Sequence, residues 1–179
     1  MSPKKTVVEK SDEGRPRFVV RAGDVPWQAE SSTGGRVRFE RKKLGAAAGG
    51  RRLGCSLVRM DAGSPSWPRH YHTANEEAVY VLDGRGTLVA GDERIPIAAG
   101  DYAALPAGPA HAHKVVNESE GELVFLCFST MVHPDVVVYP DSGKIGVFVG
   151  SAPGGAPEES ELKRFLDGSA EIDYWRDEE

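Results

Sequence analysis

The middle of the chain is a series of short apolar runs, and a small group of turn-forming residues separates each run from the next. Segments such as Asp83-Gly84 and Pro106-Ala107-Gly108 indicate turns, because Gly tolerates positive φ and Pro fixes its own φ. Strands that recur roughly every eight to twelve residues are typical of an all-β sandwich or barrel. We therefore predict an all-β fold whose two antiparallel sheets form a jelly-roll barrel. The predicted strands are Val37–Phe39, Leu53–Met60, Ala78–Leu82, Thr87–Ala90, Arg94–Ile97, Asp101–Leu105, His111–Val116, Leu123–Ser129, Val136–Tyr139 and Ile145–Val149.

The two ends of the chain differ from this middle part. We expect an N-terminal arm over residues 1–35, the β-barrel domain over 36–150, and a linker, a short helix and an acidic tail over 151–179. The helix is predicted over Glu158–Asp167, because Gly168 follows it and Gly is common just after a helix end. Glu158 to Glu179 contains nine acidic and three basic residues, so the net charge of −5 is concentrated in this tail.

Composition and charge exclude several classes of partner. The 179 residues suffice for one domain with its own core. The chain contains neither a large basic tract nor a helix-turn-helix pattern, so we expect no nucleic-acid partner. No apolar run approaches the roughly 18 residues of a membrane span, and the polar N-terminus does not resemble a signal peptide. Cys55 and Cys127 lie in apolar runs and are interpreted as free thiols, which is consistent with a cytoplasmic protein.

The segment from Arg41 to Arg52 is basic and rich in Gly and Ala. It holds five basic residues and no acidic residue. We interpret it as a solvated loop between strands. A phosphate-binding loop is the alternative, although the Gly spacing matches no known phosphate loop.

Histidine placement is the strongest chemical signal in the chain. Four of the five histidines form two His-x-His pairs, His70/His72 and His111/His113. Residues i and i+2 of a strand point to the same face, so the two imidazoles of each pair aim at one point. Glu77 follows at the start of a predicted strand. Several imidazoles with one carboxylate are typical ligands of Fe, Mn, Ni, Co or Zn, so we predict a divalent metal ion as cofactor.

The same residues resemble the two motifs of the cupin superfamily. Gly63, His70-x-His72, Glu77 and Gly84 are similar to the first motif, and Gly100, Pro106-x-Gly108, a histidine and Asn117 are similar to the second. The resemblance implies a small cupin, which is a double-stranded β-helix barrel with a metal ion in its mouth. It implies no particular reaction, because cupins include isomerases, dioxygenases, decarboxylases and sugar-binding regulators.

The second motif leaves two candidates for its metal ligand. His111 has the usual spacing from Pro106-x-Gly108, whereas His113 has the usual spacing to Asn117. We predict that His70, His72, Glu77 and His113 bind the metal, because the turn at Asn117 fixes the strand register and an insertion is absorbed more easily in the loop before it. His111 stays as the alternative fourth imidazole.

Alternation along the next strand decides between Glu76 and Glu77. If Glu77 points into the barrel, Val79 and Val81 do so as well, and Tyr80 and Leu82 point outward. Glu77 is therefore the predicted ligand.

Two classes of function are compatible with these residues. The first is a metal-dependent oxygenase, isomerase or lyase that acts on a small organic acid or a sugar-like molecule. The second is a non-catalytic module that binds or senses a small molecule and carries a structural metal. The residues leave open whether turnover occurs, and no residue beyond the metal ligands is assigned a catalytic role.

A homodimer is expected from the surplus of apolar surface. Tyr80, Leu82 and the run Val136–Tyr139 exceed what one barrel core needs, and Phe18-Val19-Val20 could contribute to the same interface.

Overall fold

Antiparallel strands make up nearly all regular structure in residues 16–31 and 38–178, which the computed structural model describes. The strands pair as a six-stranded sheet (β1-β2-β3-β10-β5-β8), a four-stranded sheet (β13-β12-β11-β4) and a three-stranded sheet (β7-β6-β9). The predicted all-β fold is therefore confirmed. The strands are β1 (Gln28–Ser31), β2 (Arg38–Lys43), β3 (Leu53–Met60), β4 (Tyr71–His72), β5 (Glu77–Asp83), β6 (Arg85–Ala90), β7 (Glu93–Ala98), β8 (Tyr102–Leu105), β9 (His113–Val116), β10 (Leu123–Thr130), β11 (Asp135–Tyr139), β12 (Lys144–Val149) and β13 (Leu162–Asp167). The helical elements are α1 (Leu44–Ala47) and the 3₁₀ turns η1 (Pro109–His111) and η2 (Pro157–Glu159).

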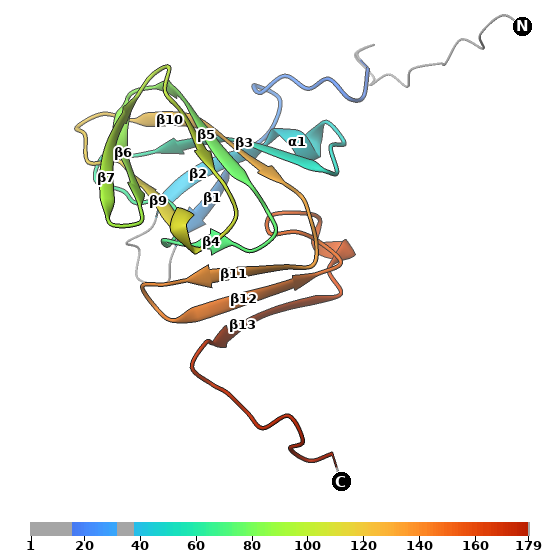
Figure 1. The fold of residues 1–179 in the computed structure, drawn as a ribbon. Coiled ribbons are helices and arrows are strands. Elements are labelled where there is room, and N and C mark those ends of the chain that lie inside the picture. Colours follow the sequence, from blue (N-terminus) through green and yellow to red (C-terminus); the bar gives the residue numbers. More distant parts are fainter. Residues whose placement is uncertain (1–15, 32–37, 179) are drawn as a thin grey trace, which may run out of the picture.

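The six-stranded and three-stranded sheets together enclose one apolar core. Figure 1 shows β11, β12 and β13 as a lower layer, with β3, β5 and β10 above it and β6 and β7 to one side. The residues of this core lie on β2, β3 and β5 to β10, and full burial of one such side chain contributes about 1.5–3 kcal/mol. The core residues are Phe39, Val58, Met60, Val79, Val81, Leu88, Ile97, Leu105, Val115, Leu123 and Phe125.

Strand β5 has the predicted alternation. Val79 and Val81 are 4% and 1% exposed, whereas Tyr80 and Leu82 are 38% and 44% exposed. Tyr80 and Leu82 thus point outward, as the expected homodimer interface requires. The homodimer itself stays a prediction.

The predicted C-terminal helix is wrong, because Leu162–Asp167 is strand β13. It pairs with β12 along its whole length, from Lys144 opposite Asp167 to Val149 opposite Leu162. The residues of this segment are good helix formers, but local propensity is weak compared with the backbone hydrogen bonds that the open edge of β12 offers. Within the predicted helix, only η2 contributes helical residues. No helix in the described part of the chain is long and apolar enough to cross a membrane.

The sheets extend beyond both ends of the expected barrel domain. Strand β1 lies within the predicted N-terminal arm and pairs with β2, while β13 lies within the predicted tail. Residues 1–15 of the arm, and positions 36 and 37 at the expected start of the barrel, lie outside the described residues.

The basic segment from Arg41 to Arg52 is only partly a loop. Arg41 and Lys43 belong to β2, and the helical turn α1 follows directly. A Cβ at Gly45 of α1 would lie 2.8 Å from the backbone nitrogen of Cys55, so this turn packs closely on β3. The first three residues of the segment are therefore held in a sheet, which matters for the pocket described below.

Candidate metal centre and its pocket

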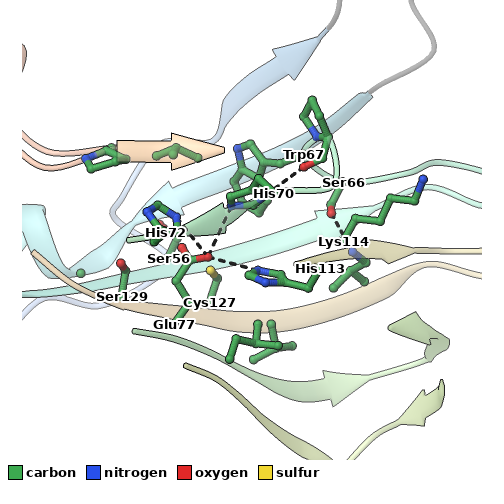
Figure 2. Close-up of a pocket in the computed structure, with 18 of the residues that line it drawn as sticks. Ser56, Ser66, Trp67, His70, His72, Glu77, His113, Lys114, Cys127 and Ser129 are labelled. Carbon is green, nitrogen blue, oxygen red and sulfur yellow. Dashed lines mark hydrogen bonds and ion pairs between the residues drawn. The ribbon is translucent and has the colours of Figure 1, made fainter. Parts of the chain in front are cut away.

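Three imidazoles and one carboxylate converge at the centre of the barrel (Figure 2). Glu77 Oε2 lies 3.2 Å from His113 Nε2, 3.4 Å from His72 Nε2 and 3.5 Å from His70 Nε2. The nearest ligand atoms of His70, Glu77 and His113 all lie within 4.8 Å of one another. We refer to His70, His72, Glu77 and His113 as the histidine–glutamate cluster.

Backbone pairing explains why residues so far apart in sequence meet. His70 and His113 form a mutual antiparallel pair, with His70 N donating to His113 O (3.0 Å) and His113 N donating to His70 O (2.8 Å). Paired residues of antiparallel strands project their side chains to the same face. His72 follows His70 by two residues, and Glu77 begins β5, which pairs with β10 in the same barrel. These pairings bring the four side chains together in the barrel.

The hydrogen bonds of the histidines leave their Nε2 atoms free to bind a metal. His70 Nδ1 lies 2.8 Å from the carbonyl oxygen of Pro68, and His113 Nδ1 lies 2.9 Å from that of His111. A carbonyl can only accept, so Nδ1 must be the donor and Nε2 carries a lone pair in the neutral ring. His72 Nδ1 is bonded to the Asp135 carboxylate, so its Nε2 also faces Glu77. Three Nε2 atoms around one carboxylate fit a divalent transition-metal ion.

The expectation that His111 and His113 aim at one point is wrong, because the strand begins only at His113 and His111 does not join the cluster. It lies in η1, its side chain is exposed, and it is outside the lining of the pocket. Its backbone carbonyl nevertheless orients His113. Turn η1 takes up the extra length between Pro106-x-Gly108 and the strand, and Gly108 before it has φ of 109°.

Asn117 fixes the register of β9, and this register directs His113 rather than His111 into the cluster. Its side chain is fully buried, and Nδ2 donates to Met60 O (2.9 Å) and to Gly121 O (2.8 Å). Its Oδ1 accepts from Ser119 N at 3.1 Å. These bonds hold the end of β9 against β3. A two-residue shift of β9, which would put His111 in the place of His113, would break several of them.

A buried carboxylate that the sequence analysis missed supports His72. Asp135 Oδ2 accepts from His72 Nδ1 at 2.6 Å and from Asn75 Nδ2 at 2.8 Å, and Asp135 Oδ1 accepts from Ala74 N at 3.0 Å. A carboxylate behind a ligating imidazole fixes the ring orientation and makes the other nitrogen a stronger donor to metal. Strand alternation could have indicated that Asp135 is buried, because it lies two residues before the buried Val137 at the start of an apolar strand.

The charged groups of the cluster shift the pKa values of one another. Burial alone would lower the pKa of His72, but its hydrogen bonds to Asp135 and Glu77 raise that pKa to about 9. Burial alone would raise the pKa of Glu77, but the adjacent imidazoles of His113, His70 and His72 hold that pKa well below its usual range. The metal-free cluster therefore keeps Glu77 ionised and carries a proton on His72 that a metal ion would displace.

The cluster lies in a cavity of about 380 Å³, a volume suited to a small organic molecule. Its apolar lining includes Trp67, Val79, Val115 and Phe125. Its polar lining includes Ser56, Ser129, Tyr139, Cys127 and the charged Glu30, Arg41, Lys114 and Lys163.

We expect the metal-free protein to lose stability as the pH rises from about 6 to about 8.5. The pKa of His72 is about 9 in the folded chain and 6.5 as its ordinary value, so its stabilising effect is complete below 6.5 and is lost as pH rises through 9. The loss is at most about 3 kcal/mol, because one pKa unit corresponds to roughly 1.4 kcal/mol. Urea unfolding of chelator-treated protein at the two pH values measures it, with His72→Gln as control. Stability that rises over this range in the unsubstituted protein would contradict the prediction.

Comparisons with known proteins agree with this geometry. The family model described as "Cupin domain" matches residues 56–129. The quercetin 2,3-dioxygenase of Bacillus subtilis is 33% identical over 94 residues, which are 51% of this chain. The chain spans only 28% of the length of that relative.

Two solved structures resemble nearly the whole fold. A putative sugar phosphate isomerase from Acidithiobacillus ferrooxidans is 27% identical with a TM-score of 0.74, over 87% of this chain and 96% of that one. A sugar phosphate isomerase of the cupin superfamily from Silicibacter pomeroyi is 27% identical with a TM-score of 0.71, over 83% of this chain and 92% of that one. The motifs, the family match and the shared fold lead to one conclusion: this chain is a cupin-domain protein with a double-stranded β-helix fold.

Proposed function

We propose that this cupin is a divalent-metal-dependent enzyme that isomerises a small sugar-like or organic-acid substrate. The observation that carries the proposal is the convergence of three Nε2 atoms on the Glu77 carboxylate inside a cavity of suitable size. All four members of the histidine–glutamate cluster are proposed ligands, and Fe, Mn, Ni, Co and Zn are the candidate ions.

The donor set is suited to binding an oxygen-rich substrate. Three neutral imidazoles and one carboxylate would leave a divalent ion with a net charge of about +1, and a six-coordinate ion would keep two open positions. A bound ion would polarise a substrate carbonyl or hydroxyl group and stabilise negative charge that develops on its oxygen.

Residues around the cluster complete the site. Tyr139 lines the pocket, and its ring lies 5.9 Å from that of His70 in a stacked arrangement. Burial, Glu77 and Asp135 raise the pKa of the Tyr139 phenol, so it stays protonated and is able to donate a hydrogen bond to the substrate. Trp67 and Phe125 form apolar walls that limit access of water.

Two observations bear on the class of reaction. Similarity to the two sugar phosphate isomerase structures extends over more than four fifths of this chain, which favours isomerisation. The sequence match to the quercetin dioxygenase, 33% identical over 94 residues, makes oxygenation the second candidate. Both reactions use the same proposed metal centre, so metal content alone does not separate them.

Metal analysis followed by activity assays tests the proposal. Protein purified without chelators is expected to contain close to one divalent ion per chain. Protein reloaded with each candidate ion should convert an aldose phosphate to the ketose phosphate, with oxygen uptake in the presence of quercetin as the competing assay. Absence of metal from the purified and the reloaded protein would refute the proposal. A thermal shift with these compounds but no turnover would favour the non-catalytic binding module.

A further inference from the structure

Three cations gather at one side of the pocket, and the metal centre does not use them. Arg41 and Lys163 line the same cavity as the histidine–glutamate cluster. Lys43 lies opposite Ser56, which lines the cavity, and paired residues of antiparallel strands project to the same face. A Cβ at Gly154, whose carbonyl oxygen accepts from Lys43 Nζ, would lie 3.7 Å from Arg41 Nη1. Arg41 and Lys43 belong to β2 and Lys163 belongs to β13, so two different sheets supply this group. We call these three residues the basic wall.

The positive charge of the basic wall is only partly compensated. Arg41 Nη2 forms an ion pair of 2.6 Å with Glu30 Oε1. Lys43 Nζ donates to the carbonyl oxygen of Gly154 at 3.3 Å. Lys163 Nζ lies 5.9 Å and 5.8 Å from the ring centres of Phe148 and Phe165. Three positive charges and the one negative charge of Glu30 leave a net charge of about +2.

Arg41 also has unused hydrogen-bonding capacity. Its Nε is buried, and within the described residues it has no hydrogen-bond partner. A buried donor without a partner is costly, and an anionic oxygen would satisfy it. The guanidinium carbon lies 5.7 Å from the ring centre of Trp67, which is a wall of the cavity.

The basic wall and the metal centre are close enough to act on one group. The Arg41 guanidinium carbon lies 5.7 Å from the ring centre of Trp67. The carbonyl oxygen of the next residue, Pro68, accepts from His70 Nδ1 at 2.8 Å, and all these residues line the same cavity. A small molecule in this cavity can therefore reach the metal centre with one end and Arg41 with the other.

We propose that the basic wall is an anion-binding subsite that holds a phosphate ester of the substrate. A phosphate monoester carries about 1.5 to 2 negative charges near pH 7, which matches a net charge of +2 better than a single carboxylate does. The planar guanidinium of Arg41 suits phosphate oxygens, and two lysines add positive charge. This inference rests on the proposed function, because it assigns the substrate of that site to the phosphorylated class.

Binding of matched probes to matched variants tests the subsite. The probes are sorbitol 6-phosphate, sorbitol and gluconate, with affinities measured by calorimetry on Mn-loaded protein and metal content recorded for each sample. Lys163→Met and Arg41→Met should each raise the Kd for sorbitol 6-phosphate about tenfold, because a hydrogen bond to a charged group is lost. Arg164→Met is the control: Arg164 is the exposed neighbour of Lys163 on β13 and points to the opposite face, so the Kd should change less than about twofold.

A substitution with the opposite expected effect completes the design. Glu30→Gln removes the partner that competes for Arg41 and should lower the Kd for sorbitol 6-phosphate. Binding of sorbitol should be similar in all variants. An unchanged Kd for sorbitol 6-phosphate in both cation variants, or equal losses for gluconate, would overturn the phosphate subsite. Lys163 lies on an edge strand and is exposed, so this result does not depend on whether Arg41→Met folds.

The two proposals fail in different ways. Protein that binds no metal but binds sorbitol 6-phosphate through Lys163 would refute the proposed function and retain the subsite. Protein that binds metal but shows no difference between Lys163→Met and Arg164→Met would retain the metal centre and refute the subsite.

Discussion

His113→Ala should remove nearly all bound metal, whereas His111→Ala should leave the metal content unchanged. His113 contributes an Nε2 atom that lies 3.2 Å from Glu77 Oε2, while the His111 side chain is exposed and outside the pocket. Loss of one ligand should weaken metal affinity by more than the roughly 10- to 100-fold typical of losing a supporting group. The measurement is metal per chain by mass spectrometry, with a circular dichroism spectrum to check that each variant is folded.

His111→Ala is a matched control. The substitution keeps the backbone carbonyl of residue 111, which accepts the hydrogen bond from His113 Nδ1. The two variants therefore differ in whether an imidazole is lost from the cluster or from the surface. Loss of metal from His111→Ala, or full metal in His113→Ala, would contradict this assignment.

The alternation of side chains along single strands was sufficient to predict how most residues of the histidine–glutamate cluster are oriented. Period-two alternation oriented His70, His72 and Glu77, because in a half-buried strand the face of a residue follows from its parity. The register of His113 depended on Asn117, whose buried hydrogen bonds fix the strand end, and η1 takes up the additional length. Each of these inferences needs only residue types within a few positions of the ligand.

Long-range pairing accounts for what the sequence analysis missed. The helix predicted over Glu158–Asp167 rested on the Gly168 that follows it, whereas Leu162–Asp167 is extended because it pairs with the edge of β12. As a strand, this segment places Lys163 and Phe165 on the face that lines the pocket. Part of the pocket therefore comes from a segment that the local pattern assigned to a separate helix.

The contact of Asp135 with His72 at the metal centre also depends on long-range pairing that the local sequence does not reveal. It is 63 positions from His72 in sequence, and no short motif joins the two residues. Only the fold brings β11 beside β4, with Val137 opposite His72.

Asp135→Asn should lower metal affinity about 10- to 100-fold although Asp135 is not one of the proposed ligands. The carboxylate accepts from His72 Nδ1 at 2.6 Å, and an amide at this position would lose the charge that strengthens the other nitrogen of His72 as a donor. Metal titration with a competing chelator measures the change. Asp141→Asn is the control, because Asp141 is half-exposed in its ion pairs with Arg69 and Lys114 and should have little effect.

Asp135→Ala should also cost about 3–5 kcal/mol of stability in the metal-free protein. The substitution leaves His72 and Asn75 without their buried partner, and breaking a buried ion pair on one side has a penalty of this size.

A double-mutant cycle with His72→Gln separates a direct role of Asp135 in metal binding from general damage to the fold. If Asp135 acts on the metal through His72, the effects on metal affinity of His72→Gln and Asp135→Asn should be strongly non-additive, because the first substitution removes the group through which the second acts. Additive losses would mean that Asp135 supports the barrel without tuning the metal centre.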